Sequence, residues 1–174
     1  MIANYLNELS DENINFLEKY TKNNEYIKNK DDNNVTLAIC FPTTEDTDDV
    51  GYTKGTARGV DYYMFKEDTV NPDIYDSNVE NYLKAIIDDF KPDVVHVFGT
   101  EYPHTLALTR AFNNPDKTLV GIQGLISVYA TVYMADLPPR VQNRKTFRDF
   151  IKKDSLIEQQ EKFVQRGEYE KEAL

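Results

Sequence analysis

Short apolar segments alternate with longer amphipathic ones along most of the chain. Strands are predicted where apolar, β-branched and aromatic residues gather, over residues 35–41, 59–66, 94–98 and 118–122. Apolar residues recur at helical spacing, or in a longer apolar stretch, over 77–90, 105–112 and 125–134. Strands without polar alternation, separated by helices, are typical of parallel βαβ units. The pattern therefore predicts an α/β sandwich with helices on both faces of a sheet.

The clearest helical pattern begins at Ser77. Ser77 is a typical N-cap, Glu80 follows three residues later as in a capping box, and apolar residues then line one face. A Lys-Pro-Asp sequence ends the pattern. The strand at 94–98 then runs directly into Gly99, which gives the order helix, strand, glycine turn and new helix.

The two ends of the chain differ in composition from its centre. Residues 1–34 are rich in Asn, Glu and Lys with patchy helical spacing, which predicts surface helices. Residues 140–174 are rich in charged residues with scattered apolar positions, which again predicts helices docked on a surface. The expected organisation of the 174 residues is one domain with its α/β core at 35–135.

The chain is acidic, with 20 basic and 30 acidic residues and a net charge of −10. This charge repels phosphate backbones, so no nucleic-acid partner is expected. No apolar run approaches the roughly 20 residues needed to span a bilayer, and residues 1–10 lack signal-peptide features, so a cytoplasmic protein is expected. The single cysteine, Cys40, falls in a predicted apolar strand, where a buried, unreactive thiol is expected.

Candidate chemistry gathers where the predicted strands end. Ligands of open parallel sheets bind at the carboxyl ends of the strands, and residues 99–104, Gly-Thr-Glu-Tyr-Pro-His, lie at one such end before a helix. Glu101 and His104 could each act as acid, base or hydroxyl acceptor. A structural role is an equal alternative, with Thr100 capping the helix and Glu101 in its first turn. His96, within the strand, is expected to be a satisfied core or near-core group.

Other chemistry has little support in the sequence. The two histidines lack a standard helical ligand spacing and no cysteine cluster exists, so no metal is expected. Residues 51–59 contain Gly-Thr-Ala-Arg-Gly but have neither P-loop nor dinucleotide-binding spacing. The acidic run at 45–49 lacks EF-hand spacing and is expected to be a solvated loop.

Two segments resemble a known family. They are residues 91–108, KPDVVHVFGTEYPHTLAL, and residues 120–129, VGIQGLISVY. They resemble the amino-terminal domain of bacterial retaining glycosyltransferases of the GT-B fold, group 1 or family 4-like, a class that includes polysaccharide biosynthesis enzymes. The resemblance extends from residue 35 to the end of the chain. It implies a Rossmann-like three-layer sandwich with a mainly parallel sheet, the amino-terminal half of a GT-B fold.

The chain departs from the family pattern in three places. The family's first strand and glycine-rich turn are not found before residue 35, so this strand is expected to be missing. Its absence would leave a gap between the strands at 35–41 and 94–98, or make them pair directly. The carboxyl-terminal domain that binds the nucleotide sugar is not found either. Gln123 stands where many relatives have a histidine, and a glutamine can hydrogen-bond a sugar hydroxyl but cannot be a general base.

The resemblance implies a hexosyltransferase-like enzyme whose full form moves a sugar from a nucleoside-diphosphate sugar to a saccharide or cell-surface glycan acceptor. Retention of configuration and no essential metal or other cofactor are expected, and this fragment alone is expected to be inactive. Catalytic residues are unassigned, and the expected substrate-binding residues are Gly99, Thr100, Glu101, His104, Gln123 and Gly124.

The expected partners are the sugar or glycan acceptor and the missing donor domain. A homo-oligomer and peripheral membrane association of the full enzyme are left open. The alternative function is a non-catalytic Rossmann-like module that binds a small ligand or a protein.

Overall fold

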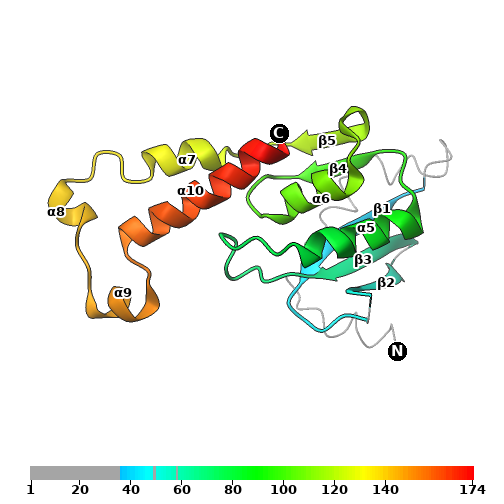
Figure 1. The fold of residues 1–174 in the computed structure, drawn as a ribbon, viewed down its shortest axis with the longest axis horizontal. Coiled ribbons are helices and arrows are strands. Elements are labelled where there is room, and N and C mark those ends of the chain that lie inside the picture. Colours follow the sequence, from blue (N-terminus) through cyan, green and yellow to red (C-terminus); the bar gives the residue numbers. More distant parts are fainter. Residues whose placement is uncertain (1–35, 49, 58) are drawn as a thin grey trace. The chain divides into compact units, whose positions relative to one another are not determined.

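The computed structural model describes residues 36–48, 50–57 and 59–174 (Figure 1). The helices predicted within 1–34 lie outside these residues. The chain divides into two compact units, and the described part of the first consists of residues 36–41, 53–57 and 59–64. The second unit holds the other described residues, 42–48, 50–52 and 65–174, and contains every residue of the candidate site.

Three strands form the first sheet, in the order β1-β3-β2: β1 (Ala38–Thr43), β3 (Val60–Lys66) and β2 (Tyr52–Ala57). Strands β1 and β3 agree with the predicted strands, whereas β2 was not predicted. Its sequence contains Gly55, which reads as a loop residue. The glycine is needed because the Tyr62 ring lies against it: a Cβ there would be 2.5 Å from the Tyr62 hydroxyl oxygen.

The second sheet is the parallel pair of β4 (Val95–Phe98) and β5 (Thr118–Gly121), as the sequence predicts. Their register pairs Val95 with Thr118 and Phe98 with Gly121. The carboxyl ends of the two strands are therefore level, and the residues that follow them share one edge.

One face of the β4–β5 pair is open to solvent. Phe98 is 51% and Leu119 52% exposed, whereas Val97 is buried. His96 is exposed, and its ring lies tilted against that of Phe98 with the two centroids 4.0 Å apart, so the expectation of a core histidine is wrong. Cys40 in β1 is exposed, whereas a buried thiol was expected, but desolvation raises the pKa of this thiol to about 12, which agrees with the expected low reactivity. The expectation for His96 assumed that an apolar run is buried on both faces, but the short β4–β5 pair has one exposed face.

Helix α5 (Asn78–Phe90) lies where the apolar spacing predicts it, with Val79, Leu83 and Ile86 buried. The predicted capping box is wrong, because the Ser77 side chain makes no capping hydrogen bond. The Asp76 carboxylate instead accepts from the Asn78 amide at 2.9 Å, since aspartate one residue earlier can reach the first free N–H.

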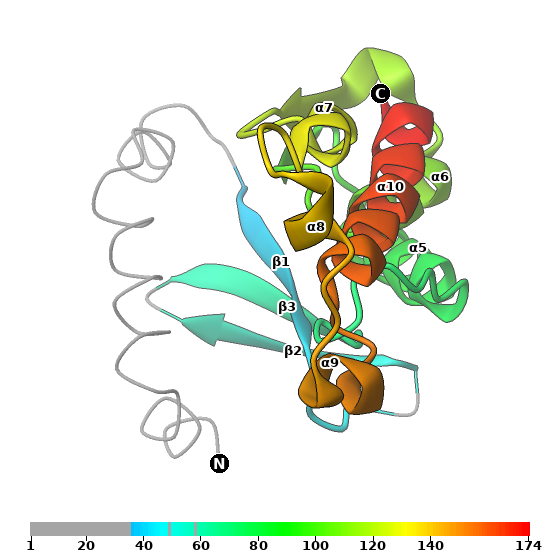
Figure 2. The same ribbon diagram turned by 90° about the vertical axis from the view of Figure 1, so that its left-hand side faces the viewer.

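The remaining large helices of the second unit pack in a chain of contacts. They are α6 (His104–Phe112), α7 (Ile126–Val132) and α10 (Leu156–Ala173). Helix α10 packs against α7 and α6, and α6 packs against α5 (Figure 2). Shorter elements complete the unit: the 3-10 turn η1 (Pro115–Lys117), α8 (Pro139–Gln142) and α9 (Phe147–Lys152).

The protein is thus α/β, with helices and two small sheets of which one is parallel. Strands β1 and β4 lie in separate sheets, so they do not pair directly in the described part of the chain. The three-layer arrangement and the missing first strand stay predictions. Within the same residues, no helix is both long and apolar enough to cross a membrane.

Candidate functional site

The ends of β4 and β5 meet at one polar edge. The Gly99 amide donates to the Gly121 carbonyl at 2.8 Å, and Gly99 has a φ of +87°, which turns the chain out of the strand. The Thr100 hydroxyl lies 3.2 Å from the Gly124 carbonyl oxygen. The structure therefore brings together Gly99, Thr100 and Gly124, as their positions after adjacent parallel strands predict.

Thr100 does not face solvent, because its hydroxyl serves an internal carboxylate. Thr100 is 2% exposed, and its hydroxyl donates to Glu170 of α10 at 2.6 Å. It is thus neither the helix cap considered from the sequence nor an open ligand contact in this arrangement.

Glu170 is itself 2% exposed and is the centre of this contact. Its carboxylate also accepts from the Ser127 hydroxyl at 2.6 Å and from the amides of Ile126 and Ser127 at 2.8 and 3.0 Å. These amides begin α7, whose N-cap residue Leu125 provides no side-chain cap. Glu170 therefore satisfies the donors that an external anion would need at the start of this helix.

The hydrogen bonds also determine the charge state of Glu170. Burial alone would raise the pKa of its carboxyl group, because it disfavours the charged form. The donors from Ser127, Thr100 and the Ile126 amide outweigh burial, so the pKa lies below its usual value. The side chain is a buried carboxylate compensated by hydrogen bonds.

The open part of the edge carries a histidine held by a second buried carboxylate. His104, the first residue of α6, has its Nδ1 atom 2.6 Å from Oε2 of Glu67, which follows β3. The Glu67 side chain is 4% exposed and the His104 side chain 22% exposed. The His104 ring stacks on Tyr102 at 5.5 Å and meets the edge of Phe65 at 5.7 Å. These contacts fix the imidazole orientation with one side towards solvent.

Glu67 also lines a surface cavity of about 310 Å³. Its other lining residues are Asp68, Ile74, Tyr75 and Asp76. In the same loop, Oδ1 of Asp73 is buried and has no hydrogen-bond partner among the described residues. The cavity and its surroundings thus present several acceptors suited to hydroxyl or amine donors.

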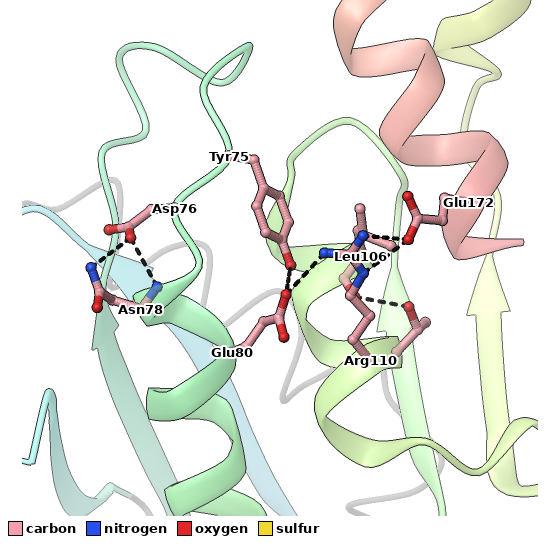
Figure 3. A network of polar contacts seen from close by, with 8 residues as sticks. Tyr75, Asp76, Asn78, Glu80, Leu106, Arg110 and Glu172 are labelled. Atoms are coloured by element: carbon pink, nitrogen blue, oxygen red, sulfur yellow. Dashed lines mark hydrogen bonds and ion pairs between the residues drawn. The ribbon is translucent and has the colours of Figure 1, made fainter.

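A polar network holds the cavity residue Tyr75 against α5, α6 and α10 (Figure 3). The Tyr75 hydroxyl donates to the Glu80 carboxylate, and Arg110 contacts both Glu80, at 3.0 Å, and Glu172. The Tyr75 hydrogen bond, together with Arg110, holds the pKa of the Glu80 carboxyl below its ordinary value although burial opposes this. The network therefore keeps the loop with Tyr75 in place at the cavity.

Glu101 lies on the open edge and is fixed through its backbone. Its carbonyl oxygen accepts from Nε and Nη2 of Arg166 at 3.0 and 2.6 Å, and the guanidinium also lies 5.9 Å from the Tyr102 ring centroid. Burial lowers the pKa of Arg166 from its ordinary value. The Glu101 carboxylate folds back over Gly99, where a Cβ would be 2.0 Å from Oε2. An alanine at Gly99 would therefore displace Glu101.

The other predicted residues are exposed after β5. Both Gln123 and Gly124 lie at the surface, and the described contacts give the Gln123 side chain no partner. The six predicted residues thus separate into two that are buried, Gly99 and Thr100, and four with open or half-open side chains or backbone, namely Glu101, His104, Gln123 and Gly124.

Sequence reasoning missed Glu67, Arg166 and Glu170. Glu67 had one usable signal, because it directly follows a predicted strand. Arg166 and Glu170 lie in a polar helix, 65 and 70 residues from the groups they contact, and no local pattern distinguishes them from the other charged residues there.

In the described ranges, no three His, Cys, Asp or Glu side chains are grouped so that they could hold a metal ion. The comparisons with known proteins give no further assignment: no protein-family model, curated protein or solved structure matches this chain.

Proposed function

We propose that this chain is the acceptor-side domain of a GT-B glycosyltransferase, a Rossmann-like three-layer domain that lacks its first strand. In this proposal the full enzyme moves a sugar from a nucleoside-diphosphate sugar to a saccharide or glycan acceptor. The chain binds the acceptor, and a second domain binds the donor. The observation that carries the proposal is the His104–Glu67 pair beside a cavity lined by carboxylates.

The pair is suited to holding a hydroxyl group. When His104 is neutral, the Glu67 carboxylate favours the tautomer with the proton on Nδ1, which leaves Nε2 as an acceptor. A sugar hydroxyl can donate to Nε2, and its neighbours can donate to the carboxylates of Asp68 and Asp76 around the cavity. The unpaired Oδ1 of Asp73 in the same loop supports a ligand rich in hydrogen-bond donors.

The edge after β4 and β5 supports the same ligand class. Glu101 and Gln123 follow strands whose carboxyl ends are level, and both have side chains that accept hydrogen bonds. Since Glu170 already occupies the first amides of α7, a donor phosphate has no free helix terminus there. This agrees with a domain that binds acceptor rather than nucleotide.

Titration of the 15N-labelled chain with a panel of mono- and oligosaccharides tests the proposal. Saturable chemical-shift changes are expected at residues 67–68, 99–104 and 123–124. The affinity for the saccharide should be at least about tenfold weaker in H104A, which corresponds to about 1.4 kcal/mol of binding free energy. H96A is the matched control, because His96 is an exposed histidine on β4 outside the Glu67 pair. Absence of saccharide binding, equal losses in both variants, or submicromolar binding of a nucleotide sugar by this chain would contradict the proposal.

A second candidate is a non-catalytic module that binds a small polar ligand or a protein. Its support is that Glu170 leaves no free amides at the start of α7 for a nucleotide-sugar phosphate, which fits a module without transferase activity as well as an acceptor domain. Screening small polar compounds by the same NMR measurement separates the two candidates. Shifts at 99–104 with non-sugar compounds, and none with saccharides, would favour the module.

A further inference from the structure

Helix α9 presents large apolar side chains to solvent. Phe147 is 79%, Phe150 76% and Ile151 64% exposed. Their spacing of i, i+3 and i+4 places them on one face of the helix. Single exposed apolar residues are common, but three adjacent ones on a six-residue helix form a patch that calls for a partner.

Basic residues surround this apolar face. Residues 140–153 hold one acidic residue, Asp149, and six basic ones: Arg140, Arg144, Lys145, Arg148, Lys152 and Lys153. All six basic residues are exposed, in a chain whose net charge is −10. Among the ion pairs between described residues, this segment contributes that of Lys145 with Glu158, at 3.3 Å. The segment is thus strongly basic in an otherwise acidic protein.

The helix is formed without the partner. The Thr146 hydroxyl accepts from the Asp149 amide at 3.2 Å, and the Asp149 carboxylate accepts from the Thr146 amide at 2.8 Å. Lys153, with a φ of 51°, ends the helix by donating its amide to the Asp149 carbonyl. The capping box therefore uses the acidic residue within the helix itself and fixes the apolar residues on one face.

We infer that residues 140–153, the basic-apolar surface, dock on the interface of a membrane that contains anionic lipids. Such an interface attracts the basic side chains to its headgroups and accepts the three apolar side chains among its acyl chains. Single-stranded nucleic acid matches the charge and can stack bases on Phe147 and Phe150, but it leaves the aliphatic Ile151 exposed, whereas acyl chains accept all three side chains. Face-to-face pairing of two copies would bury the apolar side chains but bring two basic segments together. The inference does not depend on the proposed transferase function.

Flotation of the 174-residue chain with vesicles tests the inference. Vesicles of phosphatidylcholine with about 30% phosphatidylglycerol should carry the protein, whereas pure phosphatidylcholine should not. The variants F147S/F150S and R144Q/R148Q should each weaken binding at least about tenfold. About 0.5 M NaCl should weaken binding of the native chain through screening.

The matched controls make the same kinds of substitution at exposed positions outside the basic-apolar surface. V70S/L119S removes two exposed apolar side chains, and K84Q/K117Q removes two exposed charges outside the basic-apolar surface. Both controls should float like the native chain, and circular dichroism should be the same for all variants.

Four results would overturn the inference. They are no flotation, equal flotation with neutral and anionic vesicles, equal losses in the control variants, and a light-scattering mass showing a dimer that F147S/F150S abolishes. A gel shift with RNA that requires Phe147 and Phe150, without vesicle binding, would assign the surface to nucleic acid instead.

Discussion

Glu170 is the centre of the hydrogen bonds that hold the candidate edge together. Its carboxylate accepts four hydrogen bonds, from Thr100, Ile126 and twice from Ser127, while it is 2% exposed. A glutamine at this position has nearly the same shape, but its NH₂ group cannot accept hydrogen bonds from the donors that face the carboxylate. E170Q should therefore lower the free energy of unfolding by about 2–3 kcal/mol, the cost of leaving buried donors unsatisfied.

Urea denaturation at neutral pH measures this loss. The control is E168Q in the same helix, because Glu168 is 58% exposed and pairs with Lys171 on the surface. E168Q should change stability by less than about 0.5 kcal/mol. Similar effects of the two substitutions would show that the buried hydrogen bonds of Glu170 contribute little.

The same substitution predicts a pH dependence. The folded-state pKa of Glu170 lies below its usual value, and the unfolded value is about 4.3. Its contribution to stability is therefore fully present above about pH 4.3 and lost as the pH falls through the folded pKa. The stability gap between the native chain and E170Q should narrow in acid, and a gap that stays constant down to about pH 3 would refute this account.

The tautomer of His104 is a second prediction at this scale. Because the Glu67 carboxylate can only accept, neutral His104 should carry its proton on Nδ1. In E67Q the side-chain NH₂ can donate to Nδ1, so the tautomer with the proton on Nε2 should gain population. Long-range 1H–15N correlation spectra of the ring distinguish the two forms. D68N is the control, since Asp68 bonds Val70 and Asn71 instead, and a changed tautomer there would contradict the assigned role of Glu67.

At the scale of elements, α10 and α7 approach each other closely at Gly167. A Cβ at this position would be 2.8 Å from the Ser127 Cα atom and 3.2 Å from its Cβ. Alanine normally stabilises a helix by about 1 kcal/mol relative to glycine. Here the clash with backbone should reverse the sign, and G167A should lose about 1–3 kcal/mol through overpacking.

Thermal or urea unfolding of G167A shows whether the substitution raises or lowers the free energy of unfolding. Q165A, at an exposed position of the same helix, is the matched control and should be neutral or slightly stabilising. Stabilisation by G167A would mean that the two helices can separate without cost, which would argue against close packing at Ser127.

Elements with strong local patterns could be predicted from the sequence. Helix α5 repeats apolar residues at helical spacing, and β4 and β5 are short apolar runs between turn residues, so their positions agree within a residue or two. Strand β2 could not be predicted, because Gly55 reads as a turn and becomes a strand residue only when Tyr62 covers it. The prediction that Ser77 caps α5 failed for a similar reason, because the neighbouring Asp76 competes for the same amide and accepts its hydrogen bond.

The candidate site also has a part that the sequence predicts and a part that it does not. Residues 99–104 are recognisable because they concentrate polar groups after a strand. Glu67 and Glu170 contact them from 37 and 70 residues away in the chain, and only the tertiary structure selects these two from 30 acidic residues. The sequence therefore predicts where the edge lies but not which carboxylates hold it.

At the scale of the whole molecule, stability should be unevenly distributed within the second unit. Helix α5 packs on α6, α6 on α10, and α10 on α7, and Glu170 joins α10 to the end of β4 and to the start of α7. Helices α8 and α9 have four and six residues, and most of their large apolar side chains are exposed. Helices this short are marginal without tertiary contacts.

Hydrogen exchange resolved by residue should reveal this difference. Amides of α6 and α10 should open only with global unfolding, whereas amides of α8 and α9 should exchange at least about a hundredfold faster. In E170Q, protection should fall together in α7, α10 and the end of β4, because one carboxylate connects them, and α9 should not change. Equal protection of α9 and α10, or a loss confined to α7 in E170Q, would show that Glu170 caps one helix and does not join these elements into a cooperative unit.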